Sequence, residues 1–597
     1  MTGSTLALGD WLVVGAYFLV AVGIGLAFAG RAGRSMSDYF VSGRALPWWL
    51  AGTSMVATTF AADTPLAVTG MVAEHGVAGN WLWWNMVMSG ILTVFFYARL
   101  WRRAKVLTDA EFAEIRYAGG PATFLRGFRA IYLALPINLI IMGWVNLAMV
   151  KILGVVLGFD PWTALGVLFV VTTIYVAMSG LWGVVVTDFI QFALAIGGSI
   201  VLAWFAVDAV GGMSGMRVGL EEHFGSAEEA LSFFPSVGAA WMPALTLFVF
   251  LGVQWWAAWY PGAEPGGGGY VAQRIFSART ERDGVLATLW FNIAMYALRP
   301  WPWILVALAS LILYPGLEDP ATGYVMAMVD LLPTPLRGVL VASFAAAYMS
   351  TMSTQLNWGA SYLVNDIYLR FMNPEAGTRR RIAVSRGVTV LLFVLSAIVT
   401  VNLSTIEGAW RLLLALGAGT GLVYILRWYW WRINAWSEIS AMVASGVISL
   451  TLQFGFGLSE ADPTEFAWLM LITVALSTVV WVAVTFLTSP TPDAKLVSFY
   501  RRVRPGGRGW RRISALAGHP GEAMDGGMLN WTNWVAGVTA VYATLFGTGR
   551  ILFGDTVQGL LLLLVAIAAF AWISRNLRET ATAESDRREV ESAALAP

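Results

Sequence analysis

The chain has 597 residues, of which 58% are apolar and only 12% charged, with 37 basic and 36 acidic side chains. A mean hydropathy of +0.68 and 30 tryptophans exclude an ordinary water-soluble protein. The lack of cysteine excludes disulfides, thiolate metal sites and thiol catalysis, and the net charge of +1 gives no indication of nucleic-acid binding.

Apolar runs of membrane-crossing length recur along the whole chain. A spanning segment must satisfy its own backbone hydrogen bonds, so we interpret these runs as helices. The first run, 8–29, lacks a basic start and is too long for a signal peptide, so we expect it to be retained. In chain order, about 15 spans are predicted, at 9–30, 46–73, 80–100, 127–156, 161–179, 183–209, 241–280 (interrupted), 284–314, 335–370, 382–402, 408–430, 435–456, 465–488, 531–549 and 555–574.

Basic residues in the loops predict the orientation of these spans, because lysine and arginine collect on cytoplasmic loops. Most of the 37 basic residues fall on alternate loops if the N-terminus lies outside and the C-terminus inside. The charged tail after residue 575 is expected to be partly disordered. Four arginines assigned in this way to cytoplasmic loops are Arg116, Arg129, Arg274 and Arg427.

Two predicted spans contain helix breakers. "AGTSMVATTFAADTPLAVTG" (51–70) contains Asp63 and Pro65, and "WYPGAEPGGGGYVAQR" (259–274) contains Glu264. Proline and glycine leave backbone groups without helical partners, and in hydrocarbon these groups must face protein, water or a ligand. Each break lies in the first of five consecutive spans, a pattern that indicates a transporter site near the bilayer midplane. For either segment alone, an ordinary kink or a turn between two spans is the alternative.

The ninth span carries hydroxyl groups on one helix face. In "FAAAYMSTMSTQLNWGASYLVNDIY" (344–368), Ala347, Ser350, Thr351 and Thr354 recur at helical spacing. Hydroxyl and carbonyl oxygens suit a small hard cation such as Na⁺, although a stripe of small residues also permits close helix packing.

Two charged residues lie inside predicted spans. Asp188 stands two turns into its helix, where a carboxylate usually faces a cavity or a partner; the alternative is an interfacial carboxylate stabilised by the helix N-terminus. Arg299 lies near the middle of its span and requires a carboxylate, such as Glu264, Asp63 or an acidic group on a solute. Snorkelling of Arg299 to an interface is the alternative.

Aromatic and glycine clusters admit simpler interpretations. "GAGTG" (417–421) is interpreted as packing glycine inside an apolar helix, not as a dinucleotide site, and no phosphate loop that would indicate ATP is present. The tryptophans beside the second break are expected either to stack on a solute or to pack in the core. Those tryptophans are Trp255, Trp256 and Trp259, whereas Trp81, Trp83 and Trp84 are expected to form an interfacial belt.

Three stretches of the chain resemble the sodium:solute symporter family, which includes sodium/proline, sodium/galactose and sodium/sialic acid symporters. They are "SDYFVSGRALPWWLAGTSMVAT" (37–58), "SGLWGVVVTDFIQ" (179–191) and "AAYMSTMSTQL…NDIY" (346–368), and the resemblance covers roughly 37–430. It implies an all-α integral membrane protein with a LeuT-type 5+5 inverted repeat, additional N- and C-terminal helices, and alternating access driven by a sodium gradient.

The resemblance further implies Na⁺ as the coupling ion. By position, the first sodium site takes oxygens from Ala57, Phe60, Ala347, Ser350 and Thr351. A second sodium site, which some members have, matches Asp188, Ser353 and Thr354 together with Ser350, and a complete match favours two ions per cycle.

The substrate region departs from the family pattern, because PGAEPGGGG stands where the sugar transporters carry polar and aromatic residues. The resemblance therefore does not identify the solute. The expected solute-binding residues are Thr59, Asp63, Thr64, Trp255, Trp259, Glu264 and Arg299.

The predicted organisation follows from these elements. The parts are an extra helix and first cytoplasmic loop (1–45), the first repeat (46–210), an extracellular loop (211–240), the second repeat (241–432), two additional helices (433–488), a cytoplasmic loop (489–530), two further helices (531–575) and a cytoplasmic tail (576–597).

We therefore expect a sodium-coupled symporter, and not an enzyme, that imports a small polar organic solute such as a sugar, an amino acid or an organic acid. The expected setting is the cell inner (plasma) membrane, crossed many times. The expected partners are the solute, sodium ions and the lipid bilayer, with no nucleic acid; the oligomeric state is left open, and a monomer is compatible with the sequence. A membrane sensor and a passive channel, each with a symporter-like domain, are the alternatives.

Overall fold

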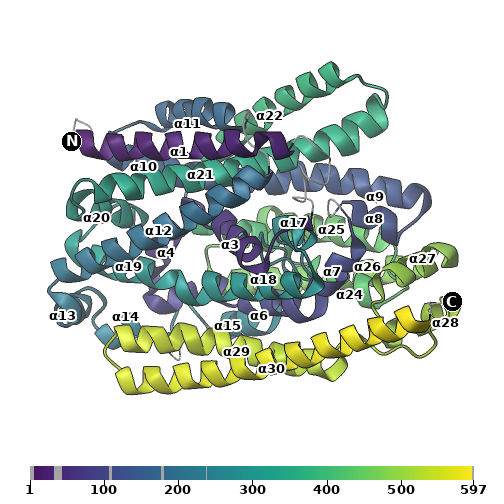
Figure 1. The fold of residues 1–597 in the computed structure, drawn as a ribbon. Helices are drawn as coiled ribbons and strands as arrows, with labels where there is room; N and C mark the ends of the chain where they lie inside the picture. Colours follow the sequence, from purple (N-terminus) through teal and green to yellow (C-terminus); the bar gives the residue numbers. More distant parts are fainter. Residues whose placement is uncertain (1–5, 33–43, 107–109, 177–180, 237, 595–597) are drawn as a thin grey trace.

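The computed structural model describes residues 6–32, 44–106, 110–176, 181–236 and 238–594. Within these residues the fold is entirely helical apart from one isolated bridge between Leu46 and Ala278. Long helices lie side by side with α1 along one edge of the bundle and the α29–α30 pair along the other (Figure 1).

The first core span is broken, as its sequence predicts. Helices α3 (Trp48–Thr59) and α4 (Asp63–His75) meet at an angle of 60° around residues 60–62. Phe60 leaves the helical path with ψ at 70°, and Pro65 follows within the first turn of α4, where its missing N–H costs no helical hydrogen bond. The break therefore leaves backbone oxygens of the last turn of α3 without helical donors.

The rest of the first half is a series of long and short helices. Their bounds are α1 (Leu8–Ala32), η2 (Val77–Asn80), α5 (Trp81–Trp84), α6 (Val87–Leu92), η3 (Thr93–Tyr97), α7 (Ala98–Ala104), α8 (Glu111–Arg116), α9 (Gly119–Tyr132), η4 (Leu133–Ile137), α10 (Asn138–Leu157), α11 (Pro161–Val176), α12 (Leu181–Ala209), α13 (Gly212–Phe224) and α14 (Ala227–Leu231). Helix α12 packs against both α3 and α21, which places Asp188 between the two helices predicted to bind sodium.

The second half begins with the other predicted break. Its helices are α15 (Ala244–Val249), η5 (Phe250–Gln254), α16 (Trp255–Ala257), α17 (Gly269–Ser277), α18 (Glu281–Ile293), η6 (Ala294–Leu298), α19 (Pro300–Leu313), η7 (Pro320–Thr322), α20 (Gly323–Leu331), α21 (Leu336–Ser361), η8 (Tyr362–Met372), α22 (Thr378–Val401), α23 (Ile406–Gly417) and α24 (Gly421–Tyr429). The segment between α16 and α17 is not helical; Gly262, Gly266 and Gly267 within it, and Gly269 at the start of α17, all have positive φ. A β-carbon on Gly267 would lie 2.9 Å from Trp101 Nε1, so the loop requires glycine there for conformation and for space.

The C-terminal part comprises α25 (Ala435–Leu450), η9 (Thr451–Gly455), α26 (Pro463–Leu487), α27 (Asp493–Val503), η10 (Arg508–Trp510), α28 (Arg511–Leu516), α29 (Gly527–Leu552) and α30 (Thr556–Ala594). Helix α30 continues beyond its membrane-length part to Ala594, and the partial disorder of the tail stays a prediction. The helix is polar beyond its membrane-length part, which is why composition alone suggested disorder.

Membrane-crossing capacity agrees with the composition. Among the described residues, nine helices are long and apolar enough to cross a bilayer, or up to eleven if each bent pair forms one span. Shorter apolar helices lie at Leu8–Ala21, Pro161–Thr172 and Ala244–Ala257. The total of about 15 spans stays a prediction.

A third break lies where the sequence suggested a continuous helix. Helices α23 and α24 meet at 49° within GAGTG (417–421), so the interpretation of this segment as uninterrupted is wrong. Its glycines do permit close packing, as expected: β-carbons on Gly417 and Gly421 would lie 2.9 Å from Trp259 N and 2.0 Å from Trp256 O. The same contacts join this break to the one after α16.

Three arginines assigned to cytoplasmic loops are instead buried. Arg129 and Arg427 each contact Glu438 Oε2, at 3.3 and 3.2 Å, and Tyr117 donates to Glu438 Oε1 at 2.5 Å. Arg116 donates to the carbonyl of Arg427 at 3.1 Å. These contacts tie α8 and α9 to α24 and α25, so the arginines have a structural role that loop counting does not reveal.

The expected interfacial belt is also wrong, because Trp81, Trp83 and Trp84 are buried at 3%, 4% and 0% exposure. Trp81 donates to the carbonyl of Phe233, and Trp83 donates to Asn80 Oδ1. The three buried tryptophans pack the bundle interior, with the N–H groups of Trp81 and Trp83 satisfied, and their clustering in the sequence resembles an interfacial belt only by composition.

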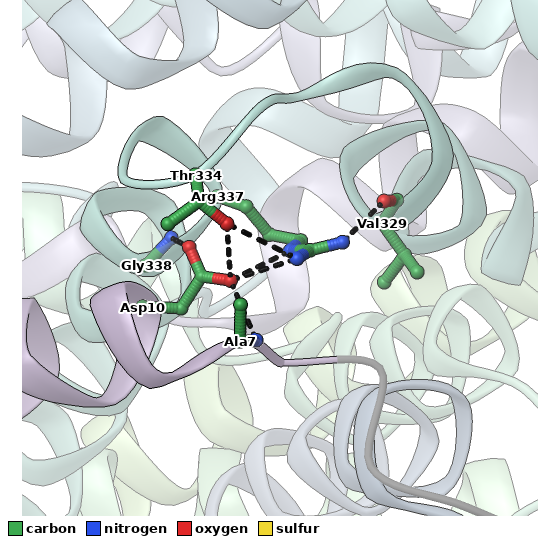
Figure 2. Close-up of polar contacts among 6 residues, drawn as sticks. All are labelled: Ala7, Asp10, Val329, Thr334, Arg337 and Gly338. Atoms are coloured by element: carbon green, nitrogen blue, oxygen red, sulfur yellow. Dashed lines mark hydrogen bonds and ion pairs between the residues drawn. The ribbon is translucent and has the colours of Figure 1, made fainter.

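The N-terminal helix is fixed to α21 by an ion pair between buried Asp10 and half-buried Arg337 (Figure 2). Asp10, fully buried on α1, accepts from Arg337 Nε and Nη2 at 3.0 and 2.8 Å and from the Gly338 backbone N–H at 3.0 Å. Ala7 N and Thr334 Oγ1 also donate to it. Asp10 thus satisfies amide groups at the start of α21, the helix with the hydroxyl stripe.

Candidate functional site

A cavity lies beside the first break and is lined by residues from both halves of the chain. About 580 Å³ of empty space lies within the cavity and at its mouth, open solvent included. From the first core span come Thr58, Thr59, Asp63 and Thr64; from α21 come Thr351 and Gln355; and Arg299, just before α19, also lines the cavity. The remaining polar and aromatic lining includes Trp83, Trp144, Trp410, Tyr260, Tyr270 and Tyr296.

The residues of the predicted first sodium site lie where α3 ends beside α21. Thr351 Oγ1 on α21 donates to the carbonyl of Thr58 on α3 at 3.4 Å, so the two segments predicted to share an ion are in contact. The five predicted ligands are Ala57, Phe60, Ala347, Ser350 and Thr351, and all are at most 4% exposed.

The local backbone explains why oxygens gather here. Phe60 N donates to both Val56 O and Ala57 O, and Thr59 Oγ1 donates to Val56 O, which ends the helix. Backbone carbonyls near the end of the helix lack helical N–H donors, and the Thr58 carbonyl instead accepts a hydrogen bond from Thr351 Oγ1. Carbonyl and hydroxyl oxygens from two helices form the ligand type that a hard cation prefers.

Asp188 lies next to this site, fully buried between α3 and α21. Ser350 Oγ donates to Asp188 Oδ1 at 2.8 Å, and Ser54 Oγ donates to Asp188 Oδ2 at 2.7 Å. Ser353 Oγ donates to the Ser350 carbonyl at 3.0 Å, and Thr354 follows on the same helix, half-buried. Of the predicted second sodium site, the structure therefore brings Asp188 and Ser350 into contact, and Ser353 lies one turn further along α21.

Arg274 belongs to the same cluster, which corrects its assignment to a cytoplasmic loop. Its side chain is 1% exposed; Nε donates to Ser54 Oγ at 3.3 Å, and Nη2 donates to Thr58 Oγ1 at 3.2 Å. Ser54 therefore links the guanidinium to the Asp188 carboxylate. This role has no local signal in the sequence, because an arginine after a glycine-rich break looks like any loop arginine.

The solute-binding candidates divide into two groups. Thr59, Asp63, Thr64 and Arg299 line the cavity, and Arg299 Nη1 donates to Thr59 Oγ1 at 3.3 Å. Arg299 is 1% exposed and its guanidinium carbon lies 5.0 Å from the Trp303 ring centre, so snorkelling to an interface is not its arrangement.

The structure places the other three candidates outside this cavity. Glu264, 4% exposed, lines a smaller separate cavity with Thr93, Thr288 and Asn292. Trp255 stacks on Trp534 with ring centres 5.7 Å apart. Trp259 is buried against Gly417, so the packing interpretation fits both tryptophans.

Several residues that line the cavity were not predicted from the sequence. Gln355 stands one helical turn after Thr351 on the same face, so extending the hydroxyl stripe by four residues would have found it. Tyr260 and Tyr270 flank the glycine-rich loop and could have been chosen with it. Trp144 and Trp410 lie in spans with no distinguishing local pattern and become visible only when the helices pack.

Several known proteins have sequences similar to this chain. A model of the sodium:solute symporter family matches residues 39–445. A sodium/glucose cotransporter of Vibrio parahaemolyticus is 25% identical over 470 residues, which cover 74% of this chain and 85% of that protein. The sodium/sialic acid symporter SiaT of Proteus mirabilis (strain HI4320) is 24% identical over 486 residues, covering 75% of this chain and 90% of that protein.

A solved structure has a similar fold. A sodium-coupled sialic acid symporter in a substrate-bound outward-open state superimposes with a TM-score of 0.63 over 81% of this chain and 99% of that chain, at 20% sequence identity. At this identity the likeness concerns the fold, which is LeuT-like and all-helical. Of the motifs noted in the sequence, the beginnings of 37–58 and 179–191 lie outside the described residues.

Proposed function

This chain belongs to the sodium:solute symporter family, and we propose that it imports a small polar organic solute together with sodium by alternating access. It is a transporter with Na⁺ as the coupled ion. The observation that carries the proposal is the 3.4 Å hydrogen bond from Thr351 Oγ1 to Thr58 O, because both residues also line the solute cavity.

Sodium would act by joining α3 to α21. Its ligands would be the oxygens of Ala57, Phe60, Ala347, Ser350 and Thr351, all buried at the end of the broken helix. An ion that binds better when these helices are together favours that arrangement. Because Thr58 and Thr351 also line the cavity, the same arrangement fixes two of its walls, and sodium binding would raise the affinity for solute.

We propose a second sodium position at Asp188, with Ser350, Ser353 and Thr354. The support is the pair of short hydrogen bonds that Asp188 accepts from Ser54 and Ser350. Ser350 would serve both positions, so two ions would bind with positive coupling. The neighbouring guanidinium of Arg274 partly neutralises Asp188, and sodium would have to compete with it.

Solute would be held by Thr59, Asp63, Thr64 and Arg299, against the aromatic lining of the cavity. The proposed setting is the inner membrane, with the N-terminus outside, the C-terminus inside, two repeats at 46–210 and 241–432, and the N-terminal helix and later helices packed around them. The Asp10–Arg337 pair supports a structural role for the helix that precedes the repeats.

The test is uptake by the full-length protein in liposomes. A thermal-shift screen of sugars, amino acids and organic acids, with NaCl or KCl, first identifies a stabilising solute. We expect that solute to accumulate above its outside concentration under an inward sodium gradient. Under a potassium gradient we expect no accumulation. Equilibration without accumulation would indicate a passive channel, and binding without any uptake would indicate a sensor.

A further inference from the structure

The solute cavity contains two oppositely charged side chains on separate helices. Asp63 is the first residue of α4, at the first break, and Arg299 precedes α19 in the opposite half of the chain. They are 4% and 1% exposed, and both line the cavity. Charged groups buried to this extent are normally paired with an opposite charge, because desolvation is otherwise costly.

These two side chains are not paired with each other. Neither has an ion-pair partner within 4.0 Å among the residues that the structure describes. Arg299 Nη1 has a 3.3 Å hydrogen bond to the neutral Thr59 hydroxyl, while its Nε is buried without a hydrogen-bond partner. The N-terminus of α4 stabilises the Asp63 carboxylate in part. The cavity thus holds a separated positive and negative charge.

The charge of the solute follows from this arrangement. A simple anion would pair with Arg299 but bring a second negative charge toward Asp63. A simple cation would pair with Asp63 but bring a second positive charge toward Arg299. A neutral polyol would leave Asp63 and Arg299 with only each other's charge, at a separation beyond ion-pair contact. A molecule with one carboxylate and one ammonium group complements both and keeps the cavity neutral.

The walls of the cavity fit the same class of molecule. Trp144 and Trp410 lie edge to face with ring centres 6.4 Å apart, and Tyr260 lies 5.9 Å from Trp410. Trp83 stacks on Tyr296 at 5.6 Å. Aromatic faces attract ammonium and quaternary ammonium groups and also cover an apolar body.

We propose that the solute is a zwitterion, such as an amino acid or a betaine, with its carboxylate on Arg299 and its ammonium group on Asp63 and the surrounding rings. This inference rests on the proposed function and narrows its solute class. It distinguishes this chain from the sugar cotransporters among its relatives, since a sugar carries no charge.

The test uses the purified full-length protein in detergent, in NaCl and in KCl. Probes are the full set of protein amino acids and glycine betaine as zwitterions, choline as a cation, N-acetylneuraminate as an anion, and D-glucose and D-galactose as neutral molecules. For the zwitterion with the largest thermal shift, the methyl ester removes the negative charge, and the N-acetyl derivative (for glycine betaine, its carbon isostere 3,3-dimethylbutyrate) removes the positive charge. We expect both derivatives to bind about 30-fold more weakly or worse.

Two charge variants assign the groups. In Arg299→Gln, the methyl ester should bind as well as the zwitterion; in Asp63→Asn, the N-acetyl derivative should do so. Arg512→Gln, an exposed charge in the 489–530 loop, is the control that should keep the wild-type ranking. Each variant is accepted as folded only if it is monodisperse, and the wild-type derivative series decides the question should a variant fail to fold.

The outcomes separate this inference from the proposed function. A sugar or a singly charged ion that stabilises the protein more than every zwitterion overturns the inference, whether or not its uptake needs sodium. A zwitterion bound equally in NaCl and KCl, and not accumulated under a sodium gradient, supports the inference while contradicting sodium coupling. Retained preference for the zwitterion in both charge variants also overturns it.

Discussion

Ser350 on α21 donates a 2.8 Å hydrogen bond to Asp188 on α12, and this contact joins the two proposed sodium positions. The same serine is a proposed ligand of the first ion, whose other ligands lie on α3 and α21. Because α12 packs against both of those helices, a change in ion occupancy at either position would alter the packing of all three. The contact thus gives a physical route from sodium binding to helix movement.

Asp188→Asn removes the charge of the second position and keeps its shape. If two sodium ions bind, the Hill slope of sodium-dependent stabilisation should fall from about 2 toward about 1. A titration of the melting temperature with NaCl at constant ionic strength measures this slope. Asp493→Asn, an exposed carboxylate in the 489–530 loop, is the matched control. An unchanged slope in a monodisperse Asp188→Asn protein would remove Asp188 from the ion sites.

Arg274→Gln removes the cation that competes with sodium near Asp188. We expect sodium affinity to rise by about 3- to 10-fold, because the carboxylate loses its internal counter-charge. For the same reason the variant should melt at a lower temperature in KCl, and NaCl should restore most of the loss. Weaker sodium binding in this variant, with Arg512→Gln behaving as wild type, would mean that Arg274 supports the site instead of competing for it.

The pair of Asp10 and Arg337 should stabilise the protein as a unit. Asp10→Asn and Arg337→Gln should each lower the melting temperature by about 5 °C, because each breaks an ion pair whose carboxylate is fully buried. The double variant should lose little more than either single variant. The pair Asp493 and Arg512, with side chains 45% and 49% exposed, should show no such effect. Additive losses in the double variant would show that the two residues act separately.

Glu264→Gln tests the division between the two cavities. Because Glu264 lines the smaller cavity and not the one with Asp63 and Arg299, we expect an altered melting temperature but an unchanged affinity for solute. Isothermal titration with the stabilising solute measures that affinity. A large change in solute affinity at unaltered stability would return Glu264 to the solute-binding residues.

Local chemistry in the sequence predicted the sites that depend on one segment. Prolines and glycines located the breaks before Asp63 and around Glu264, and helical spacing located Ser350 and Thr351. The bend within GAGTG was not predicted, because glycine in an apolar run also indicates close helix packing. Here the glycines both bend the helix and permit close packing.

Residues that depend on tertiary packing could not be found in this way. Arg274 was counted with loop arginines because its position relative to Ser54 is set by how α17 packs on α3. Trp83 was assigned to an interface because composition does not say which face of a span is buried. Pairing across the bundle, such as Asp10 with Arg337, joins positions more than 300 residues apart and leaves no local signal.

Equilibrium binding of radioactive sodium to the purified full-length protein tests the central claim without requiring knowledge of the solute. The claim predicts saturable binding to wild type, weakened about 10-fold or more in Ser350→Ala and Thr351→Ala. Ser440→Ala, a serine on α25 outside both repeats, should bind as wild type. Wild-type sodium binding in both Ser350→Ala and Thr351→Ala would contradict the placement of the ion between α3 and α21.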